Sequence, residues 1–292
     1  MTFDNLSKIE RPKNPENKFS IIIPTWNNLD YLKLCIGSIE KNSHFKHQII
    51  VMINEGNDGT EEWLKNQTHI DYVSSPDNIG ICYGLNICRP LATTNYLLYL
   101  NDDMYVLPNW DLELSKEIET IGHKQFMLSA TMIEPFDTNN KCVIVDDYGD
   151  DLGSFKEAEL LAGYMEKDKN DWSGSTWPPN IMHVDIWDLV GGMSTEFSPG
   201  MYSDPDFTMK LWKAGIRILK GVSKSRVYHF GSKSTGRIKK NKGKKTFIDK
   251  WGFTPRLFTE KYLKRGEDYD GPLEDYSLSL QEKTVNWLKK AL

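Results

Sequence analysis

Short apolar runs alternate with amphipathic segments through the first 130 residues of the chain. Phe19–Ile23 is a continuous apolar run that ends at Pro24, which predicts a buried β-strand. Apolar side chains then recur at helical spacing over Leu29–Ile39, and Asn27 or Asn28 is the expected N-cap of that helix. This alternation predicts an α/β fold with a mainly parallel central sheet flanked by helices.

The other elements follow from the same reasoning. Further strands are expected at Gln48–Ile53, Asp71–Ser74, Tyr96–Leu100, Phe126–Ile133, Ile216–Lys220 and Arg226–Phe230. Further helices are expected near Thr60–Asn66, Gly80–Arg89, Trp110–Ile121, Phe155–Met165, Asp204–Ala214, Thr246–Lys264 and Leu278–Leu292. We therefore expect a polar lead-in over residues 1–18, a main domain over residues 19–232 with halves at 19–133 and 134–232, and a basic segment with a C-terminal helical extension over residues 233–292.

Composition indicates the size of the domain, the state of the cysteines and the compartment of the protein. The 292 residues, 39% of them hydrophobic, are enough for one large domain with an appendage. The four Cys show no zinc spacing, which indicates reduced thiols. No apolar run approaches 18 residues, and the N-terminus lacks the apolar core of a signal peptide. These features predict a cytoplasmic protein with no transmembrane segment.

The charge is uneven along the chain. A net charge of −5 does not suggest a nucleic-acid partner, yet residues 233–250 hold eight Lys and Arg against one Asp. One interpretation is a lid whose Lys233, Ser234 and Arg237 contact a diphosphate. Another is a surface patch, Lys233–Lys250, that makes peripheral contact with a membrane carrying an anionic acceptor. A solvated loop with neither role is the third interpretation.

Polar side chains gather where the predicted strands end. The first four strands are followed by Pro24–Asn27, Asn54–Asp58, Pro76–Gly80 and Asn101–Asp103. Ligands of open parallel sheets bind at the carboxyl ends of the strands, so these segments are candidates for one site. Turn chemistry alone would explain such residues at one or two of these places.

Asp102 and Asp103 are the sharpest case, since two adjacent carboxylates would repel each other at a sheet edge. A divalent cation such as Mg²⁺ or Mn²⁺ removes that repulsion and prefers oxygen ligands. The alternative is an N-cap and a solvated turn before the helix near Trp110.

Several segments together resemble the family 2 glycosyltransferases. They read FSIIIPTWNN, DNIGICYGLN, LLYLNDDMYVLPNWD, GGMSTEFSPGMYSDPDFTMKLWKAG and VYHFGSKSTGR, and the resemblance covers Phe19 to Arg237. It implies the GT-A fold, in which residues 19–133 hold a nucleotide-sugar and residues 134–232 form the acceptor and catalytic half.

The resemblance also implies roles for single residues. The nucleotide and donor would contact Pro24, Thr25, Asn27, Glu55, Asp58, Asn78, Gly80, Asn101 and Asp102. The stretch NEGNDGT is one residue shorter than the usual DDGSTDGT, so Asp58 is also interpreted as a plain turn residue.

For the metal and the catalytic base, the resemblance points to three residues. Asp103, at the last position of the DxD-type motif, and His229 would bind the Mn²⁺ or Mg²⁺ ion, while a packed core residue is the alternative for His229. Asn101 replaces the first Asp of that motif, which lowers the negative charge of the site. Asp204 would be the general base; its alternative is an N-cap, with Pro205 in the first helical turn.

The activity implied is an inverting transfer of a sugar from a nucleoside-diphosphate-sugar to a hydroxyl of a glycan, glycolipid or glycoprotein. Trp177 and Asp206 are candidate contacts of that acceptor, and Trp177 could equally be core. A nucleotidyltransferase is one alternative, although PTWNNLDYL is neither glycine-rich nor basic. A carbohydrate-binding relative that has lost catalysis is the other, suggested by Asn101 and by Ser203, which replaces the usual Glu.

Overall fold

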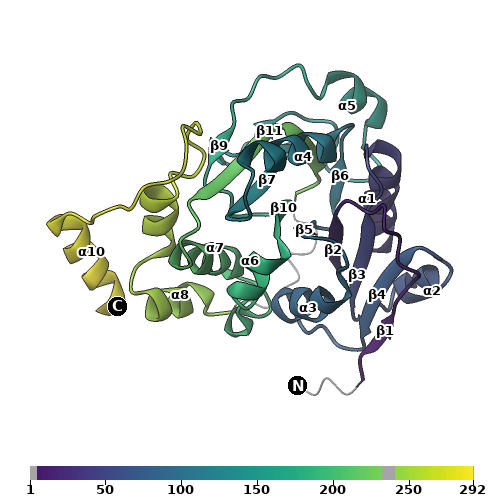
Figure 1. The fold of residues 1–292 in the computed structure, drawn as a ribbon, viewed down its shortest axis with the longest axis horizontal. Helices are drawn as coiled ribbons and strands as arrows, with labels where there is room; N and C mark the ends of the chain where they lie inside the picture. The colour runs from purple at the N-terminus through teal and green to yellow at the C-terminus, as the bar shows by residue number, and fades with distance from the viewer. Residues whose placement is uncertain (1–4, 232–240, 292) are drawn as a thin grey trace.

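The computed structural model describes residues 5–231 and 241–291, whose arrangement Figure 1 shows. A single mixed sheet runs through the molecule in the strand order β1-β4-β3-β2-β5-β10-β7-β11-β6. The strands are β1 (Ser7–Ile9), β2 (Ser20–Thr25), β3 (Gln48–Asn54), β4 (Ile70–Ser75), β5 (Tyr96–Tyr99), β6 (Met104–Val106), β7 (Phe126–Glu134), β8 (Ile144–Val145), β9 (Trp172–Ser173), β10 (Asn180–His183) and β11 (Ile218–His229).

Helices cover both faces of this sheet. They are α1 (Leu29–Asn42), α2 (Thr60–Lys65), α3 (Ile81–Cys88), α4 (Trp110–Ile121), α5 (Glu157–Gly163), α6 (Val184–Leu189), α7 (Ser203–Lys213), α8 (Gly243–Trp251), α9 (Pro255–Leu257) and α10 (Leu280–Ala291). Shorter turns are η1 (Arg89–Leu91), η2 (Thr195–Phe197) and the π-helical η4 (Phe258–Tyr262).

The period of two along the strands divides the core into two layers. In β2, Ile21 and Ile23 pack into the layer that contains the apolar sides of α1 and α4, while Ile22 packs into the layer that contains those of α3, α6 and α7. Strands buried on both faces read as continuous apolar runs, which is why these segments were recognisable in the sequence.

The first half of the sheet is parallel, as predicted, with β2 between β3 and β5 and β4 beyond β3. The second half is mixed: β10 runs antiparallel between β5 and β7, and β11 is parallel to β7 but antiparallel to β6. The sequence analysis predicted neither β6 nor β10. The predicted α/β architecture, a central sheet flanked by helices with a C-terminal helical extension, is confirmed.

Three boundaries differ from the prediction. Residues 1–18 are not only a lead-in, because Ser7–Ile9 pairs with β4 as an edge strand. The two strands expected at 216–220 and 226–230 are one strand, β11, with a register shift between Val222 and Arg226. The helix expected over 246–264 is divided, because Gly252 (φ +82°) ends α8 and Pro255 begins α9.

The C-terminal helices α8 and α10 lie at the end of the molecule opposite β1 (Figure 1). Among the residues that the structure describes, no helix combines the length and the apolar character needed to cross a bilayer.

Candidate functional site

A cleft of about 1070 Å³ opens at the carboxyl ends of β2, β3, β4 and β5. The N-terminal end of α7 and the C-terminal segment Pro255–Arg265 contribute to its other walls. Asp103 and Asp204, which are 101 positions apart in the sequence, both line it. The sequence-based expectation that these two carboxylates share a cleft is therefore confirmed.

The cleft collects ten of the residues that the sequence analysis singled out. They are Pro24, Thr25, Asn78, Gly80, Asn101, Asp102, Asp103, Trp177, Asp204 and His229. Four others do not line it: Asn27, Glu55, Asp58 and Asp206. Lys233, Ser234 and Arg237 lie outside the described residues.

Strand pairing brings Asp103 and His229 together. His229 at the end of β11 is opposite Met104 in β6, and the Phe230 amide donates to the Asp103 carbonyl at 3.2 Å. The side chains approach to 3.6 Å between His229 Nε2 and Asp103 Oδ1, and His229 Nδ1 lies 2.8 Å from Glu134 Oε1. Burial disfavours the imidazolium, yet hydrogen bonds with Asp103 and Glu134 outweigh it and raise the pKa of His229 to about 9.

These donors fit a divalent cation of the Mn²⁺ type. Asp103 offers carboxylate oxygen, and His229 would offer an imidazole nitrogen once a bound cation displaced its Nε2 proton, while Glu134 orients the ring through its other nitrogen. Within the described residues, no group of three or more His, Cys, Asp or Glu is placed to hold a metal. Additional ligands would therefore be phosphate oxygens and water.

Asp204 stands in the first turn of α7, where the cleft meets the helix. The N-cap position is Tyr202, in the left-handed region with φ +69°, so the alternative interpretation of Asp204 as the N-cap is wrong. In the described part of the chain, its carboxylate has no hydrogen bond or ion pair, and burial raises its pKa to about 7. A carboxylate with that pKa can hold or release a proton near neutral pH.

Residues 20–142 match the family model described as glycosyl transferase family 2. This part of the chain is a family 2 glycosyltransferase domain. The match spans β2 to the segment after β7 and therefore contains the strand ends around Thr25, Asn54, Asn78 and Asp103.

A curated relative and several solved structures resemble this chain. It is 26% identical over 148 residues to Protein CgeD of Bacillus subtilis (strain 168), covering 47% of this chain and 33% of that protein. The chain thus spans about a third of the length of this relative.

The solved structures show the fold. S. aureus TarS superposes with a TM-score of 0.54 at 16% identity, covering 73% of this chain and 36% of that one. GalNAc-T7 with UDP, GalNAc and Mn²⁺ gives a TM-score of 0.55 at 13% identity, covering 79% of this chain and 47% of that one. A structure of TarS 1–349 in complex with UDP-GlcNAc gives 0.52 at 16% identity and covers 74% and 61%.

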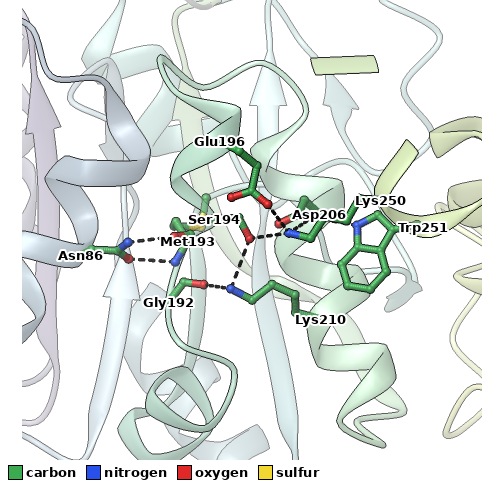
Figure 2. A network of polar contacts seen from close by, with 9 residues as sticks. All are labelled: Asn86, Gly192, Met193, Ser194, Glu196, Asp206, Lys210, Lys250 and Trp251. Carbon is green, nitrogen blue, oxygen red and sulfur yellow. Dashed lines mark hydrogen bonds and ion pairs between the residues drawn. The ribbon is translucent and has the colours of Figure 1, made fainter. Parts of the chain in front are cut away.

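Asp206 lies in a different place from the one that we expected. Its side chain is fully buried; its Oδ1 accepts a hydrogen bond from Trp251 Nε1 at 2.7 Å and forms an ion pair with Lys250 Nζ at 3.0 Å (Figure 2). Lys250 also pairs with Glu196 at 2.7 Å. These contacts attach α8 to α7, so the prediction that Asp206 contacts an acceptor is corrected to a structural role.

The turn after β3 is likewise mostly structural. Asp58 accepts hydrogen bonds from the amides of Leu29 at 2.8 Å and Thr60 at 3.2 Å, which supports the turn interpretation. Asn27 Oδ1 accepts from the Asn57 amide at 2.8 Å.

Glu55 acts on the cleft through its neighbour. Its Oε2 accepts from Trp26 Nε1 at 2.8 Å, and Trp26 lines the cleft. Glu55 therefore orients an aromatic wall of the site.

Sequence reasoning missed several residues of the cleft. Trp26 and Asn54 lie within strand-end segments that it named as candidates, although it gave neither residue a role, and Tyr99 lies just before another such segment. Glu134 ends β7 just before Pro135, a similar signal. The C-terminal residues Arg256, Thr259, Glu260 and Arg265 have no such signal, because only the return of the chain brings them to the cleft.

Proposed function

We propose that this protein transfers a sugar from a nucleoside-diphosphate-sugar to an acceptor hydroxyl. The observation that carries the proposal is that Asp103 and Asp204 line one cleft at the strand ends of a family 2 glycosyltransferase domain. The similar TarS and GalNAc-T7 folds, with UDP-GlcNAc or with UDP, GalNAc and Mn²⁺, support a nucleotide-sugar as the donor.

The nucleotide would lie against the strand ends, next to Pro24, Thr25 and Asn78. Gly80 supports this assignment: at φ +78°, a Cβ there would lie 2.3 Å from Ser198 Oγ and 2.7 Å from the Pro199 Cα. Only glycine allows the turn after β4 to approach the Ser198–Pro199 backbone so closely.

Asp103 and His229 would hold a divalent cation at the end of the cleft where the diphosphate would bind. A divalent cation supplies charge neutralisation for the departing diphosphate. Asp102, Asn101 and the buried Thr25 surround the same end of the cleft and would position the ribose and the sugar.

Asp204 would act as the general base of an inverting displacement. The acceptor oxygen forms a bond to the anomeric carbon as the bond from that carbon to the diphosphate breaks, and the hydroxyl proton passes to the Asp204 carboxylate. The raised pKa of about 7 suits this proton transfer at neutral pH. The acceptor would be a glycan, a glycolipid or a glycoprotein.

The test is to incubate the protein with a panel of nucleotide-sugars, with and without Mn²⁺, and to identify the products. Transfer or slow donor hydrolysis releases nucleoside diphosphate, and the matched Asp204→Asn variant should release far less. Pyrophosphate as the product would instead identify a nucleotidyltransferase. Donor binding without any turnover would identify a catalytically inactive carbohydrate-binding relative.

A further inference from the structure

A second cavity of about 480 Å³ adjoins the main cleft. The residues common to both openings are Thr138, Asn140, Trp177, Thr259, Glu260 and Arg265. The second cavity is also lined by Asn139, Lys141 and Glu267, and by no residue of the strand ends that would hold the donor. It therefore extends the site away from the nucleotide side, along the wall that the C-terminal segment provides.

Arg265 stands where the two openings meet. Its guanidinium lies over the Trp177 ring, 4.0 Å from the ring centre. Among the described residues this guanidinium has no ion pair or hydrogen bond. The other described arginines do have such partners: Arg11, Arg89, Arg217, Arg226 and Arg256 donate to carboxylates or backbone carbonyls.

The environment of Arg265 favours an anion from outside the chain. The side chain is half-buried, and loss of solvation lowers its pKa. Glu260, the carboxylate common to both openings, pairs with Arg256 at 2.7 Å instead. Lys141 adds a second cation to the small cavity, against the single further carboxylate of Glu267.

The backbone holds Arg265 firmly in this position. The amides of Arg265 and Gly266 donate to the carbonyls of Thr259 and Ser173, at 3.0 and 2.9 Å. A Cβ on Gly174, at φ +87°, would lie 2.8 Å from the Arg265 Cα, so glycine permits this contact. A preorganised guanidinium with no ion pair or hydrogen bond to the described residues is suited to bind a ligand.

We propose that the second cavity, with Arg265 at its junction with the main cleft, is an acceptor subsite. It would bind an anionic group of the acceptor, a phosphate or a carboxylate. The inference rests on the proposed function, because it supposes that a neighbouring hydroxyl of the same molecule reaches Asp204. Arg265 would pair with the anion, Lys141 would assist, and Trp177 would fix the plane of the guanidinium.

The experiment measures binding by calorimetry of three oligosaccharides matched in length: an uncharged one, a uronic-acid one and a phosphorylated one. We expect the wild-type protein to prefer one or both anionic probes. Arg265→Gln should weaken that binding about tenfold, since hydrogen bonds to charged groups are the strong ones. Arg265→Lys should lose less, because it keeps the charge but not the planar fork.

The matched control is Lys261→Gln, which removes a positive charge from an exposed side chain outside both cavities. Its affinity for all three probes should be unchanged, and thermal melts should show that every variant is folded. The preferred anionic probe distinguishes a phosphate from a carboxylate.

Two outcomes would overturn the inference. One is equal binding of charged and uncharged probes; the other is a loss of UDP binding, rather than probe binding, in Arg265→Gln, which would assign Arg265 to the donor diphosphate. Failure of the proposed function appears separately, as the absence of nucleoside diphosphate release from every donor by the wild-type protein.

Discussion

The two sides of α7 carry carboxylates only two residues apart, and their surroundings differ completely. Asp204 lines the cleft, has no hydrogen bond or ion pair within the described residues, and has a pKa raised to about 7 by burial. Asp206 is fully buried on the other side, where its Oδ1 accepts a hydrogen bond from Trp251 and pairs with Lys250 (Figure 2). Both are acidic residues at the positive end of a helix, so local chemistry does not distinguish them. What distinguishes them is that α8 supplies partners to Asp206, namely Lys250 and Trp251.

The largest expected effect separates these two carboxylates by activity. Asp204→Asn should lower kcat about 1000-fold, because it removes the proposed general base, while the Kd for the donor stays within about twofold. Single-turnover kinetics and calorimetric donor binding measure the two quantities. Equal loss of both would contradict the base role.

Asp206→Asn should show the opposite behaviour. Removing the buried negative charge leaves Lys250 without one of its partners, and we expect a loss of about 2 kcal/mol in the free energy of unfolding. Since Glu196 still holds Lys250, the loss should stay below that for an isolated buried pair. Urea unfolding measures it, and a double-mutant cycle with Lys250→Met isolates the pair. If Asp206→Asn left stability unchanged but lost acceptor binding, Asp206 would be an acceptor contact after all.

A third prediction concerns the proposed metal ligand Asp103. Asp103→Ala should abolish the gain in UDP affinity that Mn²⁺ provides, a loss of about thirtyfold. Titration of UDP with and without Mn²⁺ measures this gain, and Asp58→Ala, a carboxylate outside the cleft, serves as the control. Persistence of the full gain would remove Asp103 from the metal site.

The pH dependence of catalysis should report on Asp204. Because a base must be deprotonated to act, kcat should rise about tenfold between pH 6 and 8 and level off above the pKa of about 7.

The raised pKa of Asp204 gives the stability of the fold the opposite dependence on pH. The folded state holds a proton that the unfolded state has lost, so stability falls as pH rises from about 4 to 7. Asp204→Asn should remove that component, as melts across this pH range would show.

The smallest effect is expected at Asp58, whose carboxylate accepts hydrogen bonds from backbone amides. Asp58→Ala should cost about 1 kcal/mol of stability, because the amides of Leu29 and Thr60 lose their acceptor. Donor affinity should not change. A marked loss of donor affinity would return this residue to the nucleotide site.

The parallel half of the fold was predictable because its information is local. Ile21–Ile23 and Ile49–Ile53 are apolar on both faces of a strand, and α1 and α4 repeat their apolar side chains at helical spacing. The polar strand ends follow directly from those boundaries. For this reason seven of the ten predicted residues that line the cleft lie at these strand ends.

The mixed half was less predictable because its strands are short or interrupted. Asn180–His183 has four residues, too few to show a period, and it becomes a strand only because β5 and β7 lie on its two sides. Ile218–His229 appeared to be two strands because polar residues at its register shift interrupt the apolar pattern.

The sequence by itself determined the order of strands and helices in the first half and the polar chemistry at their ends, because both depend on near neighbours in the chain. Tertiary structure decided which of these side chains meet. The β6–β11 pairing sets His229 beside Asp103. Asp206 contacts α8 instead of the cleft. The C-terminal segment returns to the cleft and places the Arg265 guanidinium over the Trp177 ring. Contacts between residues far apart in the sequence depend on how the whole chain folds, and local sequence patterns do not predict them.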